Sequence, residues 1–319
     1  MVTADRLTKR YNGSLAVGGL ELAVEEGEIF GLVGPNGAGK TTTLKMLATL
    51  LVPNAGDAQI SGHSIRREPD AVRQVIGYMP DTFGVYDDMR VWEYLDFFGR
   101  CYGLPAARRR QMINDLLELV DLAHKREAYV QDLSRGMQQR LCLAHALVHD
   151  PQVLLLDEPA SGLDPRARVE LRELLRELRA LGKTILISSH ILPELEELCT
   201  SLAIIDHGRV LASGRVAEIH ERFRAGGVYR LRLLGGDDEV SAAEAVLSAL
   251  PEVASVGRQP DGVLELALRG DEADAARVLA AAVGGGARVA SFGPAASDLE
   301  ELFLQITDVD ERALAESAA

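Results

Sequence analysis

The sequence has 319 residues and a formal net charge of −14, with 47% hydrophobic and 26% charged residues. These proportions are ordinary for globular proteins and exclude a disordered chain, and the length predicts about two domains. No apolar run approaches the ~18 residues that a membrane-spanning helix needs. The acidic balance argues against nucleic acid as a partner. Three scattered cysteines predict reduced thiols in a cytosolic protein.

The charge is distributed unevenly along the chain. Residues 216–319 hold 19 acidic and 9 basic residues and no lysine, whereas residues 1–215 hold 29 and 25. This shift predicts a boundary near residue 215, between a main domain over 1–215 and a small accessory domain over 216–319.

Short apolar runs alternate with helical patterns in the main domain. The predicted strands cover residues 29–33, 153–156, 184–187 and 202–205. The predicted helices cover residues 41–51, 136–148, 166–181 and 192–199. This alternation is typical of an α/β fold with a largely parallel sheet. Such folds bind ligands at the carboxyl ends of their strands, where Gly34, Asp157 and Ser188 stand.

A glycine-rich segment joins the first of these strands to the next helix. Residues 34–41 read Gly-Pro-Asn-Gly-Ala-Gly-Lys-Thr, the pattern of a phosphate-binding loop. Glycines let successive backbone N–H groups point at phosphates, and the helix N-terminus adds positive potential. Lys40 is expected to reach the β- and γ-phosphates, and the Thr41 hydroxyl to hold magnesium. The predicted nucleotide-binding residues here are Gly34, Pro35, Asn36, Gly37, Ala38, Gly39, Lys40, Thr41 and Thr42.

The stretch from Met89 to Val148 has almost no strand-like runs and predicts an all-helical insert, a subdomain over about residues 85–150. Aromatic residues at helical spacing near its start predict a packed inner face in preference to a ligand box. His145 and His149 have the i, i+4 spacing of zinc ligands, but no third ligand is evident in the sequence, so a packed or solvated helix face is the favoured interpretation.

The next predicted strand ends in two carboxylates. Asp157 is expected to bind magnesium (Mg2+), and Glu158 to orient or deprotonate the water that attacks the γ-phosphate. An acidic pair after an apolar strand is common by itself. Downstream of a phosphate-binding loop, the same pair predicts ATP hydrolysis.

Beyond residue 215 the pattern predicts a β-α-β-β-α-β order, typical of a small ferredoxin-like α+β layer. The predicted strands cover residues 229–233, 253–256, 263–268 and 287–291. The predicted helices cover 241–250, with Ser241 as N-cap, and 271–283. A further amphipathic helix is expected over 297–306.

Residues 133–140, Leu-Ser-Arg-Gly-Met-Gln-Gln-Arg, resemble the Leu-Ser-Gly-Gly-Gln signature of ABC transporter ATP-binding subunits. The resemblance covers about residues 1–220 and implies that Ser134 and Gly136 contact the γ-phosphate of ATP held by another subunit. Arg135 and Met137 depart from the signature but leave the phosphate-contacting pair intact. An ordinary N-cap of the following helix is the alternative.

Other motifs follow in the order of that family. The resemblance implies that Tyr11 stacks on adenine, that Asp164 lies in a loop crossing a dimer interface, and that His190 contacts the γ-phosphate. The family's glutamine after Gly-Tyr-x-Pro is Asp81 here. We expect Asp81 to ligate magnesium, since this cation prefers carboxylate oxygen, and to slow turnover or make it more partner-dependent. The catalytic residues are then expected to be Glu158, His190 and Lys40.

Each chain has one phosphate loop and one signature, and the signature has to complete a site in another molecule. This requires a head-to-tail pair around two ATP molecules, formed by two copies of this chain or by this chain and a related subunit. The resemblance implies an ATPase subunit of a membrane exporter, working with separate polytopic permease subunits at the cytoplasmic face of the membrane. The C-terminal extension and residues 298–303 are similar to those of drug, antibiotic and polysaccharide exporter ATPases.

Three other functions compete with the exporter. A soluble ABC ATPase acting on ribosomes or DNA is disfavoured by the single cassette and the acidic charge. An importer subunit is hard to distinguish from an exporter subunit by this sequence, because the substrate-facing half lies in other proteins. A nucleotide-regulated scaffold without hydrolysis is disfavoured because Glu158 and His190 are both present.

Overall fold

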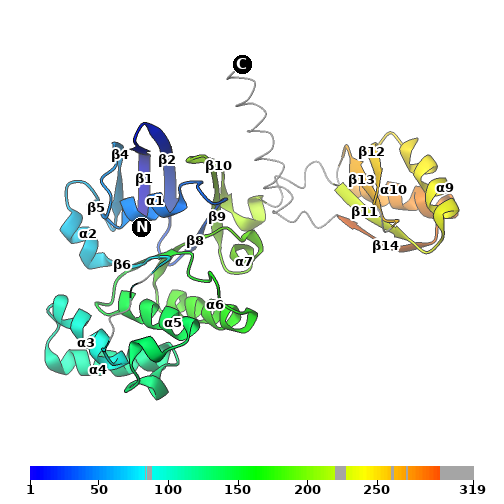
Figure 1. Cartoon of the computed structure of the whole chain (residues 1–319). Helices are drawn as coiled ribbons and strands as arrows, with labels where there is room; N and C mark the ends of the chain where they lie inside the picture. Colours follow the sequence, from blue (N-terminus) through cyan, green and yellow to red (C-terminus); the bar gives the residue numbers. More distant parts are fainter. Residues whose placement is uncertain (83, 85–87, 220–227, 260–261, 271, 295–319) are drawn as a thin grey trace. The chain divides into compact units, whose positions relative to one another are not determined.

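The computed structural model describes residues 1–82, 84, 88–219, 228–259, 262–270 and 272–294 (Figure 1). The chain forms two compact units, Met1–Val216 and Ala217–Ala319, and each has its own apolar core. None of the helices within the described residues combines the length and apolar character needed to cross a membrane.

The first unit is built on a six-stranded sheet in the order β10-β9-β3-β8-β7-β6. Its strands are β3 (Ile29–Val33), β6 (Ile76–Met79), β7 (Val153–Asp157), β8 (Thr184–Ser189), β9 (Ser201–Asp206) and β10 (Arg209–Arg215). All neighbours are parallel except β10, which is antiparallel to β9. The four predicted strands are present and fully buried, as strands covered on both faces are. β6 and β10 were not predicted.

A second, antiparallel sheet in the order β2-β1-β4-β5 also escaped prediction. It contains β1 (Val2–Tyr11), β2 (Ser14–Val24), β4 (Ala55–Ile60) and β5 (His63–Ser64). The apolar alternation of β1 is interrupted by a register shift between Ala4 and Leu7, where Arg6 has φ 47°. A bulge of this kind removes the period-two signal by which a half-buried strand is recognised in a sequence.

The helices of the first unit fall into two sets. α1 (Lys40–Leu47), α2 (Pro69–Val75), α6 (Pro165–Ala180) and α7 (Leu192–Glu196) connect strands. α3 (Val91–Cys101), α4 (Ala106–Leu119) and α5 (Arg135–Ala146), with 3-10 turns at Ala123–Lys125 and Val130–Asp132, form the predicted helical insert. Figure 1 shows α3, α4 and α5 gathered on the side of this unit opposite β1, β2 and β4.

Three details of the helix predictions need correction. α7 ends at Glu196 and not at residue 199. α1 ends at Leu47 and not at Leu51, because Thr49 takes a positive φ of 59° that no α-helix continues through. The aromatic residues of α3 are only partly an inner face: Tyr94 is 3% exposed, but Phe97 is 42% exposed.

The second unit has the β-α-β-β-α-β order predicted for it. β11 (Val228–Leu233), α9 (Asp237–Ser248), β12 (Val253–Arg258), β13 (Leu264–Leu268), α10 (Glu272–Gly284) and β14 (Val289–Pro294) follow one another. The sheet order is β12-β13-β11-β14 with antiparallel neighbours, the ferredoxin-like arrangement. Ser241 is not an N-cap: α9 begins at Asp237, and the Ser241 hydroxyl donates to the Asp237 carbonyl. The helix predicted over 297–306 lies outside the described residues.

Candidate functional site

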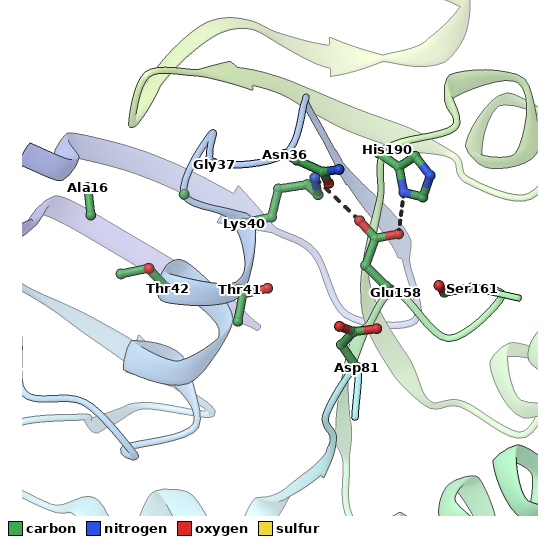
Figure 2. Close-up of a pocket in the computed structure, with 11 residues that line it drawn as sticks. Ala16, Asn36, Gly37, Lys40, Thr41, Thr42, Asp81, Glu158, Ser161 and His190 are labelled. Atoms are coloured by element: carbon green, nitrogen blue, oxygen red, sulfur yellow. Dashed lines mark hydrogen bonds and ion pairs between the residues drawn. The ribbon is translucent and has the colours of Figure 1, made fainter. Parts of the chain in front are cut away.

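A cavity of about 320 Å3 lies at the carboxyl edge of the parallel sheet (Figure 2). Its walls come from β2, the β3–α1 loop, the start of α1, and the segments after β6, β7 and β8. The lining residues are Ala16, Asn36, Gly37, Gly39, Lys40, Thr41, Thr42, Asp81, Glu158, Ser161 and His190. Parallel strands end at the same edge of their sheet, so segments distant in the sequence meet here.

The glycine-rich loop has a backbone that other residues would not adopt. Gly39, immediately before α1, has φ 104°, and a Cβ there would lie 2.5 Å from the Ala16 carbonyl oxygen. A Cβ on Gly34 would lie 2.2 Å from the Ile205 carbonyl oxygen. Glycine is therefore required at both positions, and α1 can begin at the cavity with its free N–H groups directed there.

Lys40 is a buried cation whose ammonium group contacts two backbone carbonyl oxygens and one carboxylate. Its side chain is 5% exposed. The Nζ donates to the carbonyl oxygens of Gly34 at 2.7 Å and Pro35 at 3.1 Å, and lies 3.3 Å from Glu158 Oε1. The ammonium is thus fixed at the cavity wall, as a phosphate-binding cation has to be.

Asp157, at the end of β7, has one carboxylate oxygen satisfied and one not. Oδ1 accepts hydrogen bonds from the Ser188 hydroxyl at 2.8 Å and the Thr41 hydroxyl at 3.0 Å. Oδ2 is buried with no hydrogen-bond partner. Burial raises the pKa of Asp157, and the hydrogen bonds from Ser188 and Thr41 oppose that rise. A buried carboxylate oxygen left unpaired beside a threonine hydroxyl is the donor set that a hard divalent cation requires.

Glu158 lies between two basic groups and has a left-handed backbone, with φ 49°. Figure 2 shows its carboxylate between Lys40 and His190. His190 Nδ1 is 2.8 Å from Glu158 Oε2, and the Glu158 backbone N–H donates to the Ser188 hydroxyl at 3.0 Å. The carboxylate is therefore held in one orientation inside the cavity.

Asp81 brings a second carboxylate to the wall of the cavity, two residues after β6. Figure 2 shows its side chain on the same side of the cavity as Glu158. The charge of Asp81 contributes to the raised pKa of Asp157. An ordinary glutamine at this position would not contribute this charge, so the cavity has more negative potential than the family pattern implies.

The structure does not bring every predicted residue to this cavity. Gly34, Pro35 and Ala38 shape the loop without lining the cavity, and Asp157 lies behind the wall, hydrogen-bonded to Thr41. Tyr11, at the end of β1, is 44% exposed and does not line it either. Lys9 Nζ lies 5.5 Å from the centroid of the Tyr11 ring, so one face of that ring meets a cation.

The signature residues also lie outside the cavity. Ser134 is the N-cap of α5 and accepts a hydrogen bond from the Met137 N–H at 3.4 Å. Asp164 is the N-cap of α6 and accepts from the Ala167 N–H at 2.8 Å. Ser134, Gly136 and Asp164 do not line the cavity of their own chain. The capping function considered for Ser134 from the sequence is therefore present within the single chain.

Three residues at this site had no role assigned to them from the sequence. Ser188 joins Asp157 to the backbone of Glu158, and its only signal in the sequence was its place at a strand end. Ser161 lines the cavity from within a predicted loop motif. Ala16 reaches the cavity from β2, and no chemical feature of an alanine could have identified it.

His145 on α5 and His149, three residues beyond its end, pack against aromatic rings. His145 stacks on Phe98 with the ring centroids 3.6 Å apart, and His149 stacks on Tyr102 at 3.9 Å. Burial lowers the pKa of His145 to about 4. No group of three His, Cys, Asp or Glu side chains able to hold a metal ion occurs among the described residues. Of the packed or solvated helix face favoured from the sequence, the packed alternative holds for His145, whereas His149 lies beyond the helix.

A family model described as ABC transporter matches residues 17–161. The Nod factor export ATP-binding protein I of Ralstonia nicotianae is 45% identical over 219 residues, which are 69% of this chain and 68% of that protein. The daunorubicin/doxorubicin resistance ATP-binding protein of Streptomyces peucetius is 38% identical over 314 residues, which are 98% of this chain and 94% of that protein.

Solved structures show the same similarity. An ATP-binding subunit of an ABC transporter is 32% identical with a TM-score of 0.64, and the match covers 70% of this chain and 93% of that one. A bacterial ABC transporter cassette solved as a dimer has a TM-score of 0.62 at 23% identity, over 68% of this chain and 99% of that chain, which shows a shared fold.

Proposed function

The chain belongs to the ATP-hydrolysing, ATP-binding subunits of ABC transporters, and on that premise we propose that it drives a membrane exporter. One observation carries the assignment to export. The Streptomyces relative, named for drug resistance, is similar along 98% of this chain, the C-terminal unit included. A likeness limited to the cassette would be compatible with many kinds of transporter.

In this proposal the β3–α1 loop binds the triphosphate of ATP. The support is the run of glycines with positive φ, the free N–H groups at the start of α1, and the fixed ammonium of Lys40. Together they place positive potential where the β- and γ-phosphates would lie. Tyr11 is proposed to stack on adenine through the ring face away from Lys9.

Magnesium is proposed to be held by Thr41, Asp157 and Asp81. The unpaired Oδ2 of Asp157 and the neighbouring Thr41 hydroxyl fit a hard cation that takes oxygen ligands. When bound, the ion neutralises charge on the phosphates. Comparing Asp81→Gln with the parent tests the third ligand. We expect weaker magnesium affinity and altered turnover, and unchanged values of both would exclude Asp81 from this role.

Glu158 is proposed to orient the attacking water and accept its proton. Its carboxylate lines the cavity, and both oxygens are already aligned by Lys40 and His190. The side chain of His190 is 43% exposed, and we expect it to contact the γ-phosphate. A carboxylate held within hydrogen-bond reach of a water supplies general-base catalysis.

The working unit is proposed to be a head-to-tail pair, of this chain or with a related subunit. Ser134, Gly136 and Asp164 lie outside the cavity of their own chain, so their contacts with nucleotide require a second molecule. ATP would then favour the closed pair, and hydrolysis would remove that preference. Polytopic permease subunits are the proposed membrane partners, and the cytoplasmic face of the membrane is the proposed location.

A pull-down of tagged Glu158→Gln protein from detergent-solubilised host membranes, with ATP and magnesium, tests the proposal. Trapping the ATP-bound state should preserve the complex, so we expect a polytopic membrane protein to be recovered. The identity of that protein then separates exporters from importers. Recovery of ribosomes or nucleic acid, with nothing from the membrane, would overturn the proposed function and favour a soluble ABC ATPase.

A further inference from the structure

The first turns of α5 contact the segment of residues 159–163 at three points. The side-chain amide of Gln139 donates to the Pro159 carbonyl. The guanidinium of Arg135 covers Gly162, where a Cβ would lie 2.4 Å from Arg135 Cζ. Gly136 faces Leu163, and a Cβ on Gly136 would lie 3.5 Å from Leu163 Cδ2. The helix that begins at the signature is thus in contact with the chain that leaves Glu158.

Residues 159–163 determine where the backbone of Glu158 can lie. Glu158 has a φ of 49°, a left-handed conformation that a non-glycine residue keeps only when its surroundings impose it. On the amino side, its N–H donates to the Ser188 hydroxyl. On the carboxyl side, its carbonyl accepts from the Ser161 N–H at 3.0 Å, and the next carbonyl, of Pro159, accepts from Gln139.

Gln139 is a buried polar residue on α5. Its side chain is 5% exposed, and its Oε1 is buried without a hydrogen-bond partner. Burying an amide with one end unpaired costs free energy that an apolar side chain of the same shape would avoid. The amide makes one hydrogen bond that an apolar side chain could not make, to the Pro159 carbonyl. This bond indicates that Gln139 positions the segment after Glu158.

We propose that Gln139 is a positioning residue that couples the signature end of α5 to the Glu158 carboxylate. Engagement of Ser134 and Gly136 by nucleotide on the second subunit would shift α5, and the Gln139–Pro159 bond would transmit that shift to Glu158. Each subunit would thereby align its own base only when its signature is engaged. The inference rests on the proposed head-to-tail pair.

A matched pair of variants tests the coupling. Gln138, the preceding residue, donates to the Val130 carbonyl at 3.3 Å, so its bond stays within the helical insert. We expect Gln139→Met to lower kcat for ATP hydrolysis at least tenfold while KM and the Kd for ATP stay within twofold. Gln138→Met should leave all three values within twofold. Equal losses in both variants, or an unchanged kcat in Gln139→Met, would overturn the coupling.

A second measurement does not depend on turnover. The N–H groups of Ser161 and Leu163 donate to the carbonyls of Glu158 and Ala160. Hydrogen exchange at both amides should be faster in Gln139→Met than in the parent, and unchanged in Gln138→Met. Gln139→Leu, which has no donor and an apolar side chain suited to a buried site, should repeat the result if Gln139→Met folds poorly. Unchanged exchange in a folded Gln139 variant would exclude the contact.

The two proposals fail in different ways. A parent protein that hydrolyses no ATP, or a Glu158→Gln variant that hydrolyses it at the parent rate, would contradict the proposed function. The exchange comparison would still report on the Gln139 contact. If the parent and Glu158→Gln behave as proposed and the Gln139 variant matches the parent, the coupling alone is wrong.

Discussion

The parallel sheet of the first unit and the sheet of the second unit differ in what they bury. The parallel sheet of the first unit carries buried polar side chains at one edge, among them Lys40, Asp157 and Ser188. In the described part of the second unit no polar side chain is buried, and charged residues pair at the surface, as Arg258 does with Asp237. Buried polar groups cost stability unless they are paired, so a fold keeps them where chemistry needs them. The described part of the second unit accordingly has an apolar core.

The sharpest test of this contrast is removal of the proposed base. Glu158→Gln keeps the shape of the side chain but cannot accept a proton, so turnover should fall by roughly 10²–10⁴ while ATP still binds. Phosphate release and equilibrium binding of ATP measure the two effects. Hydrolysis at the parent rate would mean that the buried polar edge works through another group.

Lys40→Ala should have the next largest effect. The substitution removes a fixed cation from the phosphate loop and leaves the Glu158 carboxylate with His190 alone, so turnover should fall by about 10²–10³. Titration with a fluorescent ATP analogue should show weaker binding, in contrast to Glu158→Gln. Normal affinity for ATP would contradict the role of Lys40 in phosphate binding.

If the apolar core of the second unit serves stability only, a substitution in it should lower stability strongly and leave ATP turnover unchanged. Leu266, on β13, is fully buried, and Leu266→Ala should cost about 2–5 kcal/mol of stability. Scanning calorimetry would detect this as a transition shifted to lower temperature. ATP turnover should remain within twofold of the parent, because the two cores share no residue. A proportional loss of turnover would break the contrast.

The helical insert contributes a pH dependence of stability through His145. Burial holds the pKa of His145 at about 4, below the ~6.5 of an unfolded chain. Above pH 6.5 His145 is neutral in both the folded and the unfolded chain, so stability does not change. As the pH falls from 6.5 toward 4 the unfolded state takes up the proton first, so stability falls, by about 2 kcal/mol at pH 5. Urea unfolding at pH 7.5 and pH 5 should show this loss in the parent and a smaller one in His145→Gln. Equal losses would contradict the assignment to His145.

The smallest effect is expected from the surface of the second unit. Asp237, the partner of Arg258, has a side chain that is 93% exposed, so water screens the pair. Arg258→Ala should change stability by less than ~1 kcal/mol and leave ATP turnover unchanged. Calorimetry beside Leu266→Ala provides the comparison. A loss as large as that of Leu266→Ala would show that surface charge, not the apolar core, stabilises this unit.

Much of this protein could be predicted from local sequence. The glycine-rich loop needs glycine at Gly34 and Gly39 for reasons of backbone geometry, so its pattern is readable without a structure. The acidic pair at Asp157 and Glu158 follows a strand that is apolar because it is buried on both faces. The ferredoxin-like order of the second unit followed from periodicity, although the start of α9 was misplaced by four residues.

Other features depend on contacts between distant segments. The antiparallel sheet was hidden by the bulge in β1. Ala16 lines the cavity only because β2 passes the phosphate loop, and Ser188 acts only because β8 lies beside β7. Gln139 looked like one more polar residue of a helix until its amide met the Pro159 carbonyl. The sequence determined the chemical groups and the local turns that present them, because these depend on neighbouring residues alone. Tertiary structure decided which groups meet, because burial and hydrogen bonding between segments far apart in the chain leave no periodic signal.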